Sequence, residues 1–145
     1  MNRIAHFDGL LPVAERPWSA SPFRARSWWQ SFGYAWQGLR DAWETQINLR
    51  LHVYIGMGAV VLGVCFRLSM MEWLWISFAI GLVIFAELMN TAIEQTVDLV
   101  VGLRPDPLAR QVKDLAAGCV LVTVFIAVVI GFLTFGPHLL AGWPS

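Results

Sequence analysis

Four polar side chains are spaced so that they share one side of a helix. Glu87, Asn90, Glu94 and Asp98 fall within about 80° of one another at 100° per residue. The stretch before them, residues 73–86, carries no charge and is typical of a membrane span. A charged side chain at membrane depth costs roughly 2.5–3.5 kcal/mol, so such residues face a bundle interior or a wet cleft and serve a function. We call these four residues the polar stripe.

A second polar group stands at the start of the last apolar segment. Lys113, the one lysine of the chain, is followed by Asp114 and then by small residues that let two helices approach closely. This approach places both residues near the cytoplasmic end of the polar stripe. Clustered carboxylates repel one another unless cations bind or some groups are protonated. Because Mg²⁺ prefers carboxylate and phosphate oxygens and a lysine can hold a phosphate, the pattern indicates a metal–phosphate site where ATP is available.

The residues alone leave three interpretations of the polar stripe open. Intramembrane carboxylates can support phosphoryl transfer, form a proton relay or ion pathway, or make a structural polar seam between helices. An ion pathway in a chain of 145 residues would need an oligomer to complete it. The sequence has no GxxxxGK phosphate-binding loop, so a soluble nucleotide-binding fold is not supported.

The elements that must position these residues are helices, three of which are predicted to span a membrane. Hydrophobic residues make up 57% of the chain and charged residues 14%, against about 25% charged in a typical soluble domain. A polar turn and a Gly- and Pro-containing loop, residues 67–72 and 102–108, separate the apolar segments. The pattern predicts one all-α membrane domain with spans at about 49–67, 73–100 and 113–136.

An amphipathic helix is predicted before the first span, over residues 23–47. Large apolar residues recur in it at spacings of three and four, which is typical of a helix lying in the membrane interface. Residues 1–22 contain three prolines and are interpreted as a loose tail, which leaves residues 23–145 as the membrane domain. The apolar face of the helix consists of Trp29, Phe32, Trp36, Leu39 and Trp43.

The charges predict an orientation and exclude one class of partner. The formal net charge is +0 without a cluster of Lys and Arg, so no nucleic-acid partner is expected. Basic residues gather before the first span and between the second and third, and such residues stay in the cytoplasm. The N-terminus is therefore expected in the cytoplasm. No signal peptide is recognised, and Cys65 and Cys119 are interpreted as small buried hydrophobic residues.

The segment ELMNTAIEQTVDLV at residues 87–100 resembles the signature of the small bacterial diacylglycerol kinase family, which includes the undecaprenol kinases. The block PLARQVKDLAAGCV resembles a second motif of this family, and GYAWQGLRDAW resembles its interfacial helix. Asn48 and His52 occupy positions where undecaprenol kinases often carry Asn and His. The resemblance covers about residues 28–140.

The resemblance implies a homotrimer in the bacterial cytoplasmic (inner) membrane, with active sites between subunits at the cytoplasmic face. Family members transfer the γ-phosphate of MgATP to a lipid hydroxyl, so ATP, Mg²⁺ and a membrane lipid alcohol, undecaprenol or diacylglycerol, are expected. The blocks LARQVKDLAAGCV and ETQINLRLH look closer to undecaprenol kinases than to diacylglycerol-specific members. The non-enzymatic alternative is an oligomeric ion-conducting or scaffold protein that uses the same polar stripe.

The resemblance also implies a role for each residue of the site. Glu87 corresponds to the base that takes the hydroxyl proton, and Glu94 to a metal ligand. Lys113 corresponds to the γ-phosphate contact, with Asp114 beside it in the nucleotide pocket. The other candidates for binding ATP or its phosphates are Asn90, Asp98 and Tyr34.

The sequence departs from the family pattern at Gln46, where members often carry a glutamate that completes the metal site. An amide oxygen can bind Mg²⁺ without contributing charge, so Gln46 stays a candidate metal ligand. Glu44 lies two positions earlier, about 200° around a helix, and is expected to point into solvent. We expect His52 to be a polar anchor at the interface and His138 to have no role.

Overall fold

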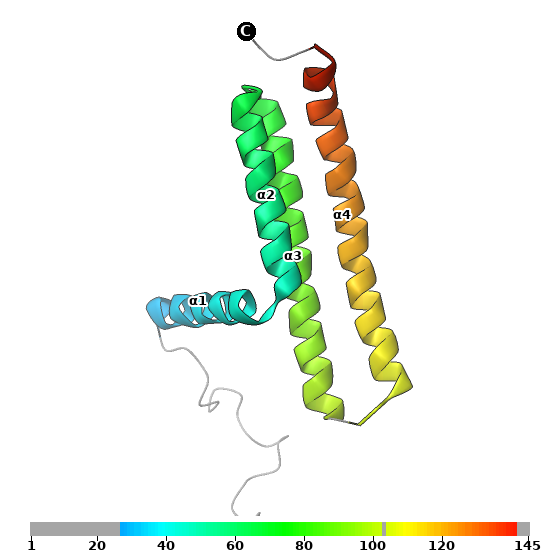
Figure 1. The fold of residues 1–145 in the computed structure, drawn as a ribbon. Helices are drawn as coiled ribbons and strands as arrows, with labels where there is room; N and C mark the ends of the chain where they lie inside the picture. The colour runs from blue at the N-terminus through cyan, green and yellow to red at the C-terminus, as the bar shows by residue number, and fades with distance from the viewer. Residues whose placement is uncertain (1–26, 103, 142–145) are drawn as a thin grey trace, which may run out of the picture. The chain divides into compact units, whose positions relative to one another are not determined.

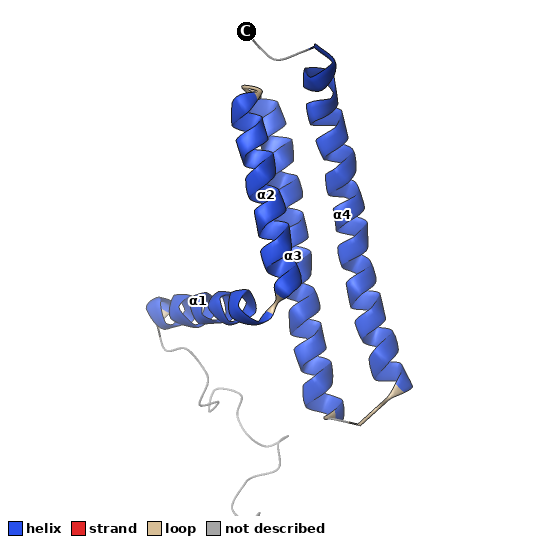
Figure 2. Ribbon diagram, in the orientation of Figure 1, coloured by secondary structure: helices blue, strands red, loops and turns tan. Residues whose placement is uncertain are grey.

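A computed structural model of the chain describes residues 27–102 and 104–141, which fold into helices and short turns (Figures 1 and 2). No strand occurs within these two ranges. Three helices are long and apolar enough to cross a membrane, which confirms the predicted all-α fold with three spans. The predicted tail, residues 1–22, lies outside the described residues. The helices are α1 (Trp28–Thr45), α2 (Ile47–Cys65), α3 (Met70–Val101) and α4 (Pro107–Ala141).

Helix α1 exposes its row of aromatic side chains, as an amphipathic helix requires. Residues up to Gly38 and residues from Leu39 form two compact units. Within the second unit, Arg50 Nη1 donates hydrogen bonds to the backbone carbonyls of Trp43 and Glu44, at 2.9 and 3.1 Å. These contacts attach the last turn of α1 to the first turn of α2 and cover carbonyl groups that the end of α1 would otherwise leave without partners.

A tight turn joins α2 to α3. Arg67 adopts a left-handed backbone conformation with a φ of 53°, which reverses the chain direction. Ser69 then caps α3: its Oγ accepts from the Glu72 N–H at 3.4 Å, and Glu72 Oε2 accepts from the Ser69 N–H at 2.7 Å. This capping box starts α3 at Met70, slightly before the predicted start at residue 73.

A second cap starts α4 at Pro107, ahead of the predicted span start at residue 113. Asp106 Oδ1 accepts from two backbone N–H groups in the first turn, at 2.8 and 2.9 Å, and a proline at the first helical position needs no partner for its nitrogen. Gly102, with a φ of 64°, follows the last residue of α3. Lys113 therefore projects from the second turn of α4 and faces the last turns of α3.

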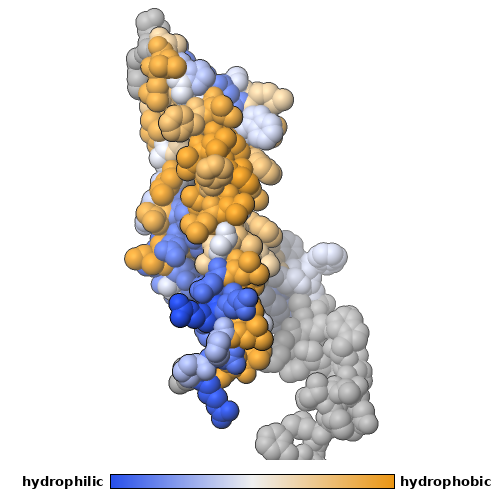
Figure 3. All heavy atoms as spheres, turned by 90° about the vertical axis from the view of Figure 1, so that its right-hand side faces the viewer, coloured by the Kyte–Doolittle hydropathy of each residue, from blue (hydrophilic) through white to orange (hydrophobic). Residues whose placement is uncertain are grey.

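Helix α3 packs against both α2 and α4 and runs antiparallel to each (Figure 1). A small apolar core of Phe66, Leu68 and Ile76 lies beside the turn between α2 and α3. Most other large apolar side chains of these helices point outward, and they cover much of the α4 side of the molecule (Figure 3). An apolar surface on long helices is what contact with lipid or with another span requires.

Gly63 of α2 lies close to side chains of the turn and of α3 and gives a test of this packing. A Cβ atom at Gly63 would lie 2.8 Å from Trp73 Cη2 and 3.1 Å from Leu68 Cδ1, whereas one at Gly58 would meet nothing within 4 Å. Overpacking of this kind costs about 1–3 kcal/mol. We expect Gly63→Ala to lower the thermal midpoint in detergent, whereas Gly58→Ala, in the same helix, leaves it unchanged or raises it slightly. Equal midpoints for the two variants would show that the helices pack differently.

Candidate active site

The first residue of the polar stripe is buried between α2 and α3. Glu87 is 5% exposed, and it is the only acidic side chain in the buried class among the described residues. Its Oε1 lies 3.2 Å from Nε2 of His52, which α2 supplies and which is also largely buried. The Thr91 hydroxyl donates to the Glu87 backbone carbonyl at 3.0 Å and so leaves the carboxylate to His52. A buried carboxylate with a single side-chain partner is an arrangement that a protein keeps for function.

The middle of the polar stripe is a pair of side chains on successive turns of α3. Asn90 Nδ2 donates to Glu94 Oε1 at 3.0 Å, and both residues are half-buried. Asn90 Oδ1 is buried and has no hydrogen-bond partner in the described structure. An unpaired buried oxygen is costly, so this atom is available to a donor or a cation that binds beside Glu94.

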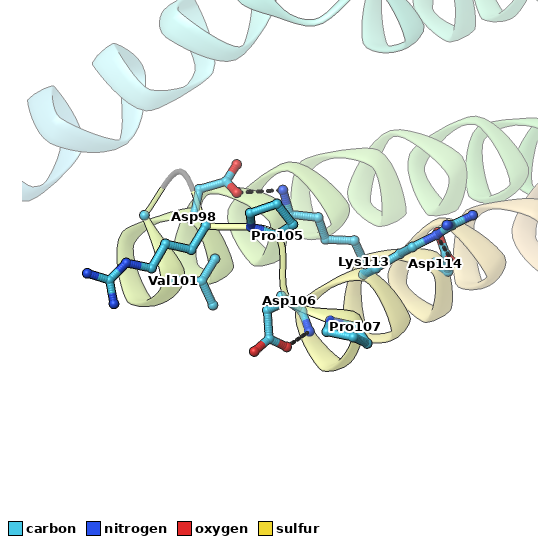
Figure 4. Close-up of a pocket in the computed structure, with 11 residues that line it drawn as sticks. Asp98, Val101, Pro105, Asp106, Pro107, Lys113 and Asp114 are labelled. Atoms are coloured by element: carbon cyan, nitrogen blue, oxygen red, sulfur yellow. Dashed lines mark hydrogen bonds and ion pairs between the residues drawn. The ribbon is translucent and has the colours of Figure 1, made fainter.

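The last residue of the polar stripe forms an ion pair with α4. Lys113 Nζ lies 2.6 Å from Asp98 Oδ1, as the small residues after Lys113 predicted (Figure 4). The pair borders a pocket of about 680 Å³ formed by the end of α3, the loop and the start of α4. Asp114 also borders this pocket, but its carboxylate is 71% exposed and lies 3.6 Å from Arg110 Nε. The structure thus divides the predicted cluster into neighbouring pairs.

The polar stripe crosses from a three-helix region into a two-helix region. Helix α2 begins at Ile47, only a few residues before His52, so α3 and α4 continue beyond α2 past the level of Glu87 (Figure 1). The part of α3 that carries Asp98 lies in this continuation. At 1.5 Å per residue, the eleven positions from Glu87 to Asp98 correspond to about 16 Å along the helix.

Both histidines contact a carboxylate from another helix. His52 Nε2 lies 3.2 Å from Oε1 of the buried Glu87. His138 Nε2 lies 2.8 Å from Glu72 Oε1 at the opposite end of the helices. The turn between α2 and α3 contains the signal that was missed. Residues can be counted from this turn, backward along α2 to His52 and forward along α3 to Glu87. The two counts place both residues at the same depth in the helices to within about one helical turn.

Glu44 is exposed, as expected, and its carboxylate lies 2.8 Å from Nε of Arg40 on the same helix. Gln46 is not helical: its φ of −101° and ψ of 109° make it the residue between α1 and α2. Helical phase therefore does not relate the direction of Gln46 to that of Glu44. Tyr34 is exposed on α1, in the N-terminal unit.

The donors in the polar stripe fit Mg²⁺ in kind. Within the described ranges, no three His, Cys, Asp or Glu side chains converge as a complete metal cage. Glu94 and the unpaired Asn90 Oδ1 nevertheless supply a carboxylate and an amide oxygen on one face of α3. Mg²⁺ is usually held by one or two carboxylates together with substrate phosphates, so an incomplete oxygen site matches its chemistry.

Comparison with known proteins identifies similar sequences along most of the chain. A family model described as prokaryotic diacylglycerol kinase matches residues 33–135. The chain is 39% identical to the undecaprenol kinase of Bacillus subtilis over 110 residues, which cover 76% of this chain and 89% of that protein. It is 35% identical to a diacylglycerol kinase of Synechocystis over 139 residues (92% and 79%). It is 28% identical to the Escherichia coli K12 diacylglycerol kinase over 106 residues (73% and 86%).

Proposed function

The chain belongs to the prokaryotic diacylglycerol kinase family and is a multi-pass membrane lipid kinase with ATP as its co-substrate, and from this premise we propose that Glu87 is its catalytic base. The observation that carries this role is the burial of the Glu87 carboxylate, 5% exposed, beside His52 at the border of the apolar part of the helices. A base at this level meets a lipid hydroxyl while the lipid chain stays among apolar side chains. General-base catalysis of this kind contributes about 10²–10⁴-fold to a rate.

The proposed reaction is an in-line transfer of the γ-phosphoryl group. The lipid hydroxyl oxygen forms a bond to the γ-phosphorus while the bond from that phosphorus to the β–γ bridging oxygen breaks. The hydroxyl proton passes to the Glu87 carboxylate, and ADP leaves with the bridging oxygen. Solvent later takes the proton from Glu87, which restores the base. The protein contributes mainly positioning and charge stabilisation to a transfer of this type.

The nucleotide is proposed to bind along the hydrated end of α3 and α4. Lys113 supplies the positive charge that contacts the γ-phosphate, and Asp98 holds it when no nucleotide is bound. Asp114 lines the same pocket and is proposed to contact the nucleotide. Asn90 is proposed as polar support for the phosphates, and Tyr34 as a contact of the nucleotide.

Glu94 and Gln46 are proposed as the residues that hold Mg²⁺. Glu94 is half-buried and has one carboxylate oxygen engaged by Asn90, which fixes the side chain on the proposed site's face of α3. The role of Mg²⁺ in such enzymes is to neutralise charge on the phosphates. Asn90 orients Glu94 and offers its own unpaired oxygen beside it.

The functional unit is proposed to be a homotrimer in the bacterial inner membrane. A single chain leaves Asp98 and Asp114 58% and 71% exposed, and its described acidic residues form no complete metal cage. Both features fit a site that a second subunit completes. The distribution of basic residues supports a cytoplasmic N-terminus and a cytoplasmic loop between α3 and α4.

The proposed substrate is a membrane lipid alcohol, undecaprenol or diacylglycerol, and a panel of lipids tests it. Purified protein in detergent is incubated with γ-labelled ATP, Mg²⁺ and either diacylglycerol, undecaprenol or ceramide. Label on the hydroxyl of one alcohol identifies the substrate. Label on no lipid by well-folded protein would contradict the proposed substrate class.

Substitution at Gln46 tests the proposed metal site. Gln46→Glu adds a charged oxygen, so we expect the free Mg²⁺ needed for half-maximal activity to fall by about threefold or more. Glu44→Gln is expected to change this value little, because Glu44 is exposed and paired with Arg40. Activity is titrated against free Mg²⁺ at saturating ATP. If Glu44→Gln weakens the response and Gln46→Glu is silent, Glu44 is the ligand instead.

A further inference from the structure

The carboxylate of Glu87 has one described side-chain partner, and that partner comes from a different helix. His52 Nε2 on α2 lies 3.2 Å from Glu87 Oε1 on α3, with the two side chains 18% and 6% exposed. The contact pairs the side-chain nitrogen Nε2 with one of the two carboxylate oxygens, and it becomes an ion pair when the imidazole is protonated.

The other hydrogen-bond donors near the polar stripe contact residues other than Glu87. Asn90 donates to Glu94 at 3.0 Å, and Lys113 pairs with Asp98 at 2.6 Å. Neither interaction restrains the Glu87 carboxylate. A glutamate side chain turns about three bonds, and in this region of the described structure His52 is the group that holds its end in place.

His52 also marks a boundary between two surroundings. On one side it contacts Glu87, and on the other it lines a cavity of about 290 Å³ whose remaining walls are apolar side chains and glycines of α2, α3 and α4. The imidazole thus lies where the apolar interior of the helices meets the polar stripe. A lipid hydroxyl that approaches Glu87 would arrive at this level.

We propose that His52 is a positioning residue whose Nε2, 3.2 Å from Glu87 Oε1, holds that oxygen in place and so directs Oε2 toward the lipid hydroxyl. This inference rests on the proposed role of Glu87 as the base. The two oxygens of a carboxylate are rigidly linked, so engaging one of them sets the direction of the other. Productive proton transfer needs heavy-atom distances of about 2.6–3.2 Å, so the orientation of Oε2 acts directly on the rate of transfer.

Two substitutions of similar size separate this role from simple packing. In His52→Gln the amide nitrogen can occupy the place of Nε2 and donate to Glu87, whereas in His52→Asn the shorter side chain withdraws its donor. We expect His52→Asn to lower kcat by about 10–100-fold, as misplacement of a reacting group does, and His52→Gln to stay within about fivefold of the wild type. KM for ATP should change by less than about threefold in both, because the nucleotide pocket is untouched.

His138→Asn is the matched control, because it removes the equivalent contact with Glu72, 2.8 Å long, at the opposite end of the helices. Its kcat should match the wild type. If His52→Asn is as active as wild type, or if the Gln and Asn variants lose activity equally, His52 does not position Glu87 through Nε2. Thermal midpoints of all three variants show whether an equal loss comes from unfolding, and a loss confined to kcat in folded His52→Asn supports the proposal.

A double-mutant cycle separates this inference from the base assignment. If His52 acts through Glu87, His52→Asn should have almost no further effect on kcat in a Glu87→Gln background, although it lowers kcat in the wild type. Near-normal activity of Glu87→Gln would overturn the base role and with it the role of His52. An inactive Glu87→Gln beside a fully active His52→Asn would overturn only the role of His52.

Discussion

Glu87→Gln is expected to lower kcat by about 10²–10⁴-fold, the range that a positioned general base supplies. Glutamine keeps the length of the side chain, and its Oε1 can still contact His52, so the packing between α2 and α3 should survive. The amide cannot take up the proton of the lipid hydroxyl. KM for ATP is expected to stay within about threefold, because Glu87 is proposed to contact the lipid hydroxyl and not the nucleotide. Initial rates at saturating lipid and ATP, together with binding of a fluorescent nucleotide, provide the measurement.

Glu72→Gln is the control for this substitution. Glu72 also lies on α3 and also contacts a histidine, but at the other end of the helix. Glutamine can keep the capping box but removes the negative charge beside His138 and at the start of α3, so we expect a lower thermal midpoint without a change in kcat of the folded protein. A Glu87→Gln enzyme that retains more than a tenth of wild-type kcat would show that another group takes the proton.

Lys113→Gln is expected to lower kcat by about 10²–10³-fold, as the loss of one transition-state charge contact does. The substitution removes the proposed contact of the γ-phosphate with the only lysine in the chain. It also removes the partner of Asp98 at 2.6 Å, so the unpaired carboxylate repels the phosphates. Lys113→Arg restores the charge but not the compact ammonium geometry, so we expect an intermediate rate. KM for ATP should rise in Lys113→Gln, in contrast to Glu87→Gln.

The charge-matched control is Arg67→Gln, in the turn at the opposite end of the spans. It changes the net charge by the same amount and should leave both kcat and KM for ATP unchanged. If the two substitutions have equal effects, the loss in Lys113→Gln reflects overall charge. If Lys113→Gln keeps normal kinetics, the γ-phosphate contact belongs to another residue.

Features that depend on one helix were predictable from the sequence, and features that depend on the register between helices were not. The polar stripe and the three spans follow from spacing and hydropathy along single segments, and the Lys113–Asp98 pair follows from small residues at one contact. The pairing of His52 with Glu87 requires the depth of each residue in two antiparallel helices. Counting from the turn gives that depth to within about one helical turn, but which side chains face one another also depends on the left-handed Arg67, which no local pattern indicated.

The ends of the helices were predictable only where a cap has a sequence signal. Asp106 followed by Pro107 is a standard helix start and could have placed the beginning of α4 correctly. The break at Gln46 has no such signal, because neither glycine nor proline interrupts the sequence around it. Its backbone is extended, and the hydrogen bonds of Arg50 with the end of α1 span this break. Because Gln46 lies outside a helix, its position relative to Glu94 could not be predicted from helical periodicity.

The continuation of α3 beyond the start of α2 gives the two substrates different solvation along one helix. Under the proposed roles, the lipid hydroxyl meets the γ-phosphate at the level of Glu87, while the rest of the nucleotide extends along the hydrated stretch toward Asp98. The product keeps the same chain but gains a phosphate monoester, which a low-dielectric setting strongly disfavours. Its headgroup is therefore drawn toward water as soon as the new bond exists. Hydration of the product thus opposes the reverse reaction and clears the base for the next lipid, which never has to leave the bilayer.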